Sequence, residues 1–351
     1  MQPSNLEREL KRYDFLESQA VLSAFRRLLP AVSLSELIKI RFHDHTSFLS
    51  NPRSFDEVFS RGYVAMRQIS SGIGLVLDDL IVSNIKSTIP NPFRVDDLAP
   101  QGHELFGSAF NLTDITQSIK ESGYYIFPTP LRNDVLQALQ SLFSKTTPDA
   151  SSGRVDANEE ATSSDIDLLR FALSKIFLNI AGNYLEVCPI LDSIILGRSS
   201  VSVALSEQSL SANAMTWHYD KDRTSFIKFF VYLNDVDASN GPHQYIQGTR
   251  NIAHEHASPD LRIGSRLVYE KFPFESINTI SGPAGTMFVA DTHTIHRGLP
   301  PIERERHLLQ FQYSSSLFGA PFSHLPTSVI ERDELLILAR EYPRVFSRYR
   351  A

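Results

Sequence analysis

The sequence predicts an α+β protein with a jelly-roll core, a cupin-like double-stranded β-helix, surrounded by helices and preceded by a helical region. Three observations predict this class. In the first 110 residues, apolar side chains recur every three or four positions, as in amphipathic helices. From about residue 194 the period changes towards two, and short apolar runs alternate with Gly, Pro, Asn and Asp turns. The last segment, about 327–350, returns to helical spacing.

Composition places the chain among globular proteins. Its 351 residues are enough for one large domain with additions or for two domains. Hydrophobic residues make up 42% and charged residues 21%, which excludes wholesale disorder. The net charge of −6 argues against a nucleic-acid partner. No apolar run is long enough for a membrane span, and the oligomeric state is not indicated.

Cysteine usage and the N-terminus bear on location. The N-terminal residues are charged and lack the apolar stretch of a secretory signal. Cys188 is the single cysteine, which excludes an intrachain disulfide and a cysteine-based zinc site. A reducing compartment fits this usage, so we expect a cytoplasmic protein.

The helical N-terminal region, residues 1–110, contains several separate segments. A helix is predicted over 5–29, and Pro30 ends it. Ser33 and Glu36 have the spacing of a capping box for a second helix. The stretch 54–85 also favours helix, and residues 88–103, with three Pro, form a connection.

The main domain is expected over residues 111–351. Residues 113–131 predict a helix and a short strand with Gly123 as the break, and residues 131–145 predict another helix. Residues 146–165 have almost no large apolar side chains, which predicts a loop rather than a lid. Residues 168–185 are strongly apolar and predict one helix.

Five runs predict the strands of the jelly-roll core, which spans about 194–316. They are residues 194–205, 225–236, 265–272, 285–291 and 306–315. A C-terminal helix follows over about 327–350, with an exposed basic end.

A candidate metal site begins in the segment WHYD, residues 217–220, which we expect to be a strand. In an extended segment alternate side chains share a face, so His218 and Asp220 point the same way. A second imidazole is available from His293 or His296. Two His and one carboxylate on one face of a metal form the facial triad of non-haem Fe(II) oxygenases, which leaves positions open.

A keto-acid co-substrate at those positions needs a fixed cation for its distal carboxylate. Arg suits this role because its planar guanidinium pairs bidentately with a carboxylate and stays charged. Arg306 begins a predicted strand shortly after His296, so the returning chain can bring it to the same cavity. Arg304 is the competing choice for this role, but it lies in the turn. The non-functional alternative for Arg306 is a surface ion pair with Glu303 or Glu305.

Four segments in order resemble the phytanoyl-CoA dioxygenase family of Fe(II)/2-oxoglutarate oxygenases. They are WHYD, FFVYLNDVDASNGPHQYIQGTRN, GPAGTMFVADTHTIHRG and RHLLQFQY. The upstream ESGYYIFPTPL is similar to the strand that opens the family's domain. The resemblance covers about residues 112–320 and leaves the first 110 unexplained. A lone His-x-Asp is a weak signal, whereas four elements in register are fairly specific.

The resemblance implies roles for individual residues. His218, Asp220 and His296 correspond to the iron ligands, and the His-x-Gly pattern favours His296 over His293. Arg306 corresponds to the residue that binds the C5 carboxylate of 2-oxoglutarate. Three positions depart from the family pattern and affect the expected co-substrate contacts: Gly298, Tyr219 and Phe230. Lys228 and Tyr232 share a face with Phe230, so all three are candidate cofactor-binding residues, although each taken singly is a packing residue.

The implied activity is a 2-oxoglutarate-dependent dioxygenase that uses Fe(II) and O₂. It would hydroxylate a small organic molecule with release of succinate and CO₂, and desaturation or cyclisation remain open. Asp220 argues against halogenation, because related halogenases have a small residue there. The alternatives are a cupin-like metal-dependent isomerase, a non-catalytic binding protein, or an enzyme with a macromolecular substrate that docks on residues 1–110. His43, His45, His254 and His256 are read as solvated loop residues.

Overall fold

The structure is a computed structural model that describes residues 5–28, 75–93, 101–148, 153–201, 214–257, 261–320, 322–326, 328, 330 and 335–350. Its helices are α1 (Asn5–Leu28), α5 (Val76–Thr88), α6 (His103–Phe106), α7 (Leu112–Ser122), α8 (Asn133–Thr146), α9 (Glu159–Ser163), α10 (Ile166–Ala172), α11 (Lys175–Leu185), α13 (Ala253–His256), α14 (Ser265–Lys271) and α15 (Leu335–Glu341). Its strands are β1 (Tyr124–Ile126), β2 (Gly153–Asp156), β3 (Ile190–Ser200), β4 (Phe226–Tyr232), β5 (His243–Ile246), β6 (Ile277–Ile280), β7 (Met287–Ala290), β8 (His296–Gly298), β9 (Arg306–Ser314), β10 (Leu325–Pro326) and β11 (Tyr349–Arg350).

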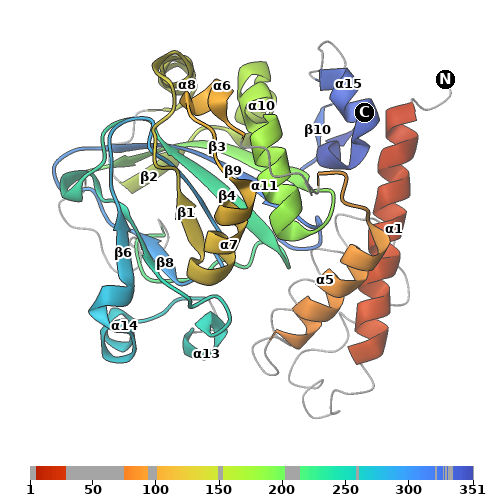
Figure 1. Ribbon diagram of the computed structural model, residues 1–351, viewed down its shortest axis with the longest axis horizontal. Coiled ribbons are helices and arrows are strands. Elements are labelled where there is room, and N and C mark those ends of the chain that lie inside the picture. Colours follow the sequence, from red (N-terminus) through yellow and green to blue (C-terminus); the bar gives the residue numbers. More distant parts are fainter. Residues whose placement is uncertain are drawn as a thin grey trace.

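Two antiparallel sheets form the centre of the molecule (Figure 1). The larger sheet has the strand order β1-β7-β4-β9-β3-β2, and the smaller has the order β6-β5-β8. Strand β4 lies between β7 and β9, with Phe230 opposite Phe288 on one side and Gln310 on the other. The mixed fold of helices and antiparallel sheet therefore agrees with the predicted class.

Side chains alternate along β4, so the two faces of this strand contribute to two different hydrophobic clusters. Phe229 contacts Phe177 of α11 and stacks on Phe311 of β9, with ring centroids 5.1 and 4.9 Å apart, so this face of the larger sheet is covered by helices. Phe230 and Tyr232 belong instead to a cluster that includes residues of β5 and β6. All seven β4 residues are buried because they face a core on both sides.

The predicted helix at the N-terminus is confirmed as α1, which packs against α5 and against the C-terminal segment. Two buried ion pairs link these helices to later parts of the chain. Glu17 of α1 pairs with Arg344, and Asp78 of α5 pairs with Lys221. The capping box at Ser33 and the helix expected after it lie outside the described residues, and the domain boundary at 110 stays a prediction. No helix in the described ranges is long and apolar enough to cross a membrane.

The prediction of a loop over 146–165 is wrong in part. Residues Gly153–Asp156 form β2, which pairs antiparallel with β3, and Glu159–Ser163 form α9. The polar sequence does not indicate this strand, because β2 is stabilised by pairing with the distant β3 rather than by apolar side chains of its own.

Three further expectations need correction. The strand predicted over 265–272 is instead helix α14, Ser265–Lys271, which is supported by an Arg266–Glu270 ion pair one turn apart. The helix predicted over 168–185 is two helices, α10 and α11, which meet at Ser174.

Of the helix predicted over 327–350, the described residues contain α15, which ends before Pro343 because proline lacks the N–H that an α-helix needs. A 3₁₀ turn, Pro343–Phe346, and β11 follow it. The basic end is exposed only in part, because Arg344 and Arg348 are 0% and 2% exposed whereas Arg340 is exposed.

Candidate metal centre

The backbone brings His218 and His296 together. The N–H of each donates to the carbonyl of the other, at 3.0 and 2.8 Å, in an isolated antiparallel bridge. The N–H of Asp220 donates to the Thr292 carbonyl at 2.8 Å. The segment that carries His218 and Asp220 is therefore fixed against the chain that leads into β8.

Three side chains from these two segments form a compact ligand set. One ligand atom from each of His218, Asp220 and His296 lies within 4.8 Å of the others. The Nε2 atom of His218 is 3.5 Å from Asp220 Oδ1, and that of His296 is 3.7 Å from Oδ2. A single divalent metal, with bonds of about 2 Å, fits among these atoms. No other such group of three is found in the described part of the chain.

The two imidazoles are oriented in the same way. Nδ1 of His218 contacts the Thr216 carbonyl at 2.8 Å, and Nδ1 of His296 contacts the Thr294 carbonyl at 2.9 Å. A carbonyl only accepts hydrogen bonds, so each Nδ1 carries the proton and each Nε2 offers its lone pair. Such outer hydrogen bonds fix the tautomer of metal-binding His residues.

The electrostatics suit metal binding. Burial, together with the neighbouring His296, lowers the pKa of His218 to about 3, and burial also lowers the pKa of His296. Burial alone would raise the pKa of Asp220, but the Lys228 ammonium and the two imidazoles lower it below its ordinary value. The site thus presents two neutral imidazoles and one carboxylate at neutral pH, the forms that bind a cation.

Lys228 contacts the ligand set directly. Its Nζ donates to Asp220 Oδ2 at 2.7 Å and to Asp222 Oδ2 at 2.9 Å. Burial would lower the pKa of Lys228, but these two carboxylates raise it, so the ammonium stays charged. Lys228 is therefore bonded to the candidate metal ligand Asp220 and does not have a free ammonium group for a co-substrate.

A cavity of about 250 Å³ opens beside the three ligands. It is lined by Arg154, Asp156, Ala214, His218, Asp220, Lys228, Phe230, His243, His296, Gly298, Arg306 and Gln310. Its charged groups are paired within the cavity, Arg154 with Asp156 and Lys228 with Asp220, except Arg306.

Within the described part of the chain, Arg306 is a buried cation that pairs with no carboxylate. It is 3% exposed, its Nε has no partner, and its two Nη atoms make only long contacts to the Leu299 carbonyl (3.3 Å) and Ser199 Oγ (3.4 Å). Burial lowers its pKa to about 10, which still leaves it charged at neutral pH. A buried unpaired charge is costly, so this guanidinium is suited to an anion that enters the cavity.

Gly298 makes room for that guanidinium. A Cβ atom at this position would lie 2.8 Å from Nη2 of Arg306. The glycine at this position therefore lets the Arg306 guanidinium lie against β8, the strand that begins with His296.

The other predicted residues fall in different places. Phe230 lines the cavity and stacks on Phe288, with ring centroids 4.8 Å apart. Tyr232 lies behind the wall, where its hydroxyl donates to the Ile280 carbonyl and contacts Nδ1 of His243 at 3.0 Å. Arg304 is half-exposed and pairs with Asp237 outside this cavity. The sequence alone does not distinguish these roles.

Two further groups of residues that line this cavity are not among the predicted site residues. His243 lies on β5, and Arg154 and Asp156 lie on β2, in a polar segment for which the sequence predicts a loop. His293 lies outside this cavity, bonded to Asp291 at 2.6 Å.

No protein-family model matches the sequence, and no curated protein matches it. Among solved structures, the chain is similar to SnoN, an alpha-ketoglutarate-dependent epimerase from nogalamycin biosynthesis, at 15% identity over 57% of this chain and 82% of that one (TM-score 0.44). It is similar to HygX from Streptomyces hygroscopicus with nickel, 2-oxoglutarate and hygromycin B, at 16% identity over 61% and 90% (TM-score 0.41). It is also similar to EctD from S. alaskensis with 2-oxoglutarate and 5-hydroxyectoine, at 16% identity over 66% and 86% (TM-score 0.44). Likenesses of this degree decide neither the family nor the reaction of this chain, and the phytanoyl-CoA dioxygenase resemblance stays a prediction.

Proposed function

We propose that this chain is an Fe(II)- and 2-oxoglutarate-dependent oxygenase with a jelly-roll core, which oxidises a small organic molecule. One observation carries the proposal. The unpaired, buried guanidinium of Arg306 shares a cavity with the His218, Asp220 and His296 ligand set. A metal alone would not need this cation, whereas a keto acid bound to the metal through one end would have its other carboxylate there.

The protein residues divide the work between two ends of the cavity. His218, Asp220 and His296 would hold Fe(II) on one side and leave the cavity side open. Bound there with 2-oxoglutarate, Fe(II) supplies O₂ activation, and oxidation of the substrate is coupled to release of succinate and CO₂. Arg306 would orient the co-substrate by charge-assisted hydrogen bonds to its distal carboxylate.

Lys228 acts in this proposal as a positioning residue. It occupies Oδ2 of Asp220, which leaves Oδ1 for the metal, and Asp222 holds the ammonium from the other side. Hydroxylation is the proposed outcome for the substrate, with desaturation or cyclisation as variants of the same chemistry.

An anaerobic titration tests the proposal. Fe(II)-loaded protein is titrated with 2-oxoglutarate, and the weak visible charge-transfer band of the bound keto acid is recorded for wild type, His218→Ala and Arg306→Ala. Arg304→Ala is the matched control, since Arg304 is a nearby arginine that pairs with Asp237 outside the cavity.

We expect a band in wild type and Arg304→Ala, none in His218→Ala, and a band only at much higher 2-oxoglutarate concentration in Arg306→Ala. Wild-type protein that binds metal but shows neither a band nor 2-oxoglutarate affinity would contradict the proposal. A cupin-like isomerase or a metal-binding protein without catalysis would then be the better account.

A further inference from the structure

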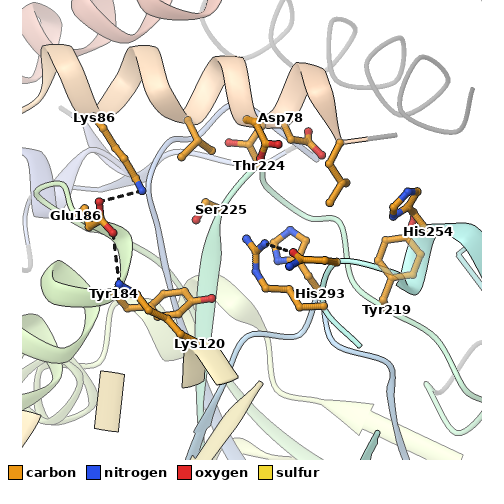
Figure 2. A pocket seen from close by; sticks show the side chains of 15 residues that line it. Asp78, Lys86, Lys120, Tyr184, Glu186, Tyr219, Thr224, Ser225, His254 and His293 are labelled. Carbon is orange, nitrogen blue, oxygen red and sulfur yellow. Dashed lines mark hydrogen bonds and ion pairs between the residues drawn. The ribbon is translucent and has the colours of Figure 1, made fainter. Parts of the chain in front are cut away.

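A second cavity, of about 310 Å³, lies between α5 and the core (Figure 2). It shares no lining residue with the metal cavity among the described residues. The extended segment at 217–220 separates the two, because Tyr219 lines the second cavity whereas His218 and Asp220 line the first. The proposed oxygenase chemistry leaves this second cavity without a role.

Helix α5 presents a row of three different chemical groups to this cavity. Asp78, Val82 and Lys86 are spaced by four residues and so lie along one face of the helix. The row runs from a carboxylate through an apolar side chain to an ammonium. The helical rise separates the Cα atoms of Asp78 and Lys86 by about 12 Å, so the two charged ends are well apart.

The basic end of the cavity carries more positive than negative charge. Lys86 and Lys120 lie 3.1 and 3.5 Å from the same carboxylate, that of Glu186 (Figure 2). One carboxylate between two ammonium groups leaves one positive charge uncompensated. An anionic group of a ligand would be attracted to this end.

The remaining wall holds buried polar atoms without partners. They are Asp78 Oδ1, Thr224 Oγ1 and His293 Nε2, and their side chains are 5%, 3% and 6% exposed. Lys221 occupies only the Oδ2 atom of Asp78. Because buried polar atoms in proteins are nearly always hydrogen-bonded, these three atoms are available to a water molecule or a ligand in the cavity.

The hydrogen bonds of Asp291 determine whether Nε2 of His293 accepts or donates a hydrogen bond. Asp291 Oδ1 accepts from Nδ1 of His293 at 2.6 Å and from its backbone N–H at 3.0 Å, while Tyr184 and Arg250 donate to Oδ2. With the proton on Nδ1, the Nε2 atom of a neutral His293 is an acceptor. Asp78 Oδ1 is also an acceptor, so this part of the cavity calls for a hydrogen-bond donor.

We propose that the second cavity binds an elongated zwitterion of the ω-amino acid type. Its ammonium group would donate to Asp78, Thr224 and His293. Its methylene chain would lie along Val82, and its carboxylate would contact Lys86 and Lys120. This inference is independent of the metal centre, because it uses none of the residues proposed to bind Fe(II) or 2-oxoglutarate.

The probe is 6-aminohexanoate, with hexanoate and hexylamine as ligands of the same chain length that each lack one charge. Binding to the full-length wild-type protein is measured by isothermal titration calorimetry and by the shift in melting temperature. We expect 6-aminohexanoate to bind at least tenfold more tightly than either single-charge probe. Equal binding of all three, or no binding of any, would overturn the proposal.

Matched variants locate the site. Thr224→Val keeps the side-chain shape and removes an unpartnered hydroxyl, and Lys86→Gln removes the charge at the other end. Lys145→Gln, in the last turn of α8 and exposed, is the control for loss of a surface lysine.

We expect Lys86→Gln to weaken 6-aminohexanoate about tenfold, Thr224→Val to weaken it severalfold, and Lys145→Gln to have no effect. Hexylamine binding should not change in Lys86→Gln. If Lys145→Gln weakens the zwitterion as much as Lys86→Gln does, the effect is one of net charge and the proposal is wrong.

Discussion

Lys228 donates a 2.7 Å hydrogen bond to Oδ2 of Asp220, the carboxylate of the candidate ligand set. Lys228 also bonds to Asp222 at 2.9 Å, so it is held in place whether or not Asp220 binds a metal. A fixed positive charge beside the centre opposes a divalent cation and favours an anionic co-substrate. The pair would therefore set the balance between the two proposed ligands of the cavity, the metal and 2-oxoglutarate.

The variant Lys228→Met should change these two affinities in opposite directions. Without the ammonium we expect Co(II), as a stand-in for Fe(II), to bind about tenfold more tightly, and 2-oxoglutarate to bind the Co(II) form several times more weakly. Calorimetric titration of each ligand measures both. Lys221→Met, which removes another buried lysine paired with an aspartate, controls for a general loss of charge. A loss of both affinities in Lys228→Met would mean that the lysine supports only the local structure.

The space at Gly298 should be as important for the co-substrate as the charge of Arg306. In Gly298→Ala the new methyl group would lie 2.8 Å from Nη2 of Arg306 and displace the guanidinium. We expect the dissociation constant of 2-oxoglutarate to rise about tenfold while that of Co(II) stays unchanged. Gly264→Ala is the control, because nothing lies within 4 Å of a Cβ at that position. Unchanged 2-oxoglutarate binding in Gly298→Ala would show that the space at this position is not needed for co-substrate binding.

The sequence could predict the parts of the site that follow from local alternation. His218 and Asp220 lie on one face because they are two apart in an extended segment, and Arg306 begins β9, a strand whose apolar run is plain in the sequence. The choice of His296 over His293 came from a family pattern. The structure gives a separate physical distinction, since Asp291 binds the ring of His293 and directs it away from the other two residues.

What the sequence could not predict depends on distant partners. Arg154 contributes to the cavity only because β2 pairs with β3, and nothing in its polar segment indicates that pairing. The burial of Arg344 has a similar origin, since arginine is normally exposed and its partner Glu17 lies at the other end of the chain. The roles of Lys228 and Tyr232 also required knowing which groups face them across the fold.

The ion pair between Glu17 and Arg344 should be essential for holding α1 against the C-terminal segment. Both side chains are almost fully buried, and Arg344 also donates to the carbonyls of Cys188 and Ser315. Removing one partner of a buried pair leaves an uncompensated charge, so Glu17→Leu should lower the free energy of unfolding by about 3 kcal/mol or more. Urea denaturation followed by circular dichroism measures this.

The double variant Glu17→Leu/Arg344→Met separates the pair from packing. Replacing both charges by apolar groups of similar size should restore most of the lost stability. Glu9→Leu, at an exposed ion pair with Arg12 on the same helix, should change stability by less than about 1 kcal/mol. A double variant no more stable than Glu17→Leu would show that the carbonyl contacts of Arg344, not its charge pair, hold the segment.

Asp192 should make the stability of the protein depend on acid pH. This carboxylate on β3 is 2% exposed and bonds to Arg223 at 2.9 Å through each oxygen, with Arg348 and Gln312 also in contact. Burial alone would raise its pKa, but the two guanidinium groups lower the pKa below the ordinary value of 3.8. The unfolded chain therefore takes up this proton more readily than the folded one, so the stabilisation is present above pH 3.8 and is lost as the pH falls through the folded pKa.

Asp192→Asn provides the test, because the amide cannot lose a proton. The difference in unfolding free energy between wild type and Asp192→Asn should be largest near neutral pH, by about 3 kcal/mol, and should shrink as the pH falls below about 4. Urea denaturation at a series of pH values measures the difference. Asp156→Asn, whose ion pair with Arg154 is partly exposed, should show a much smaller dependence. A constant difference down to pH 3 would mean that the geometry of the Asp192 contacts, rather than the charge on the carboxylate, stabilises the junction of β3 with the C-terminal segment.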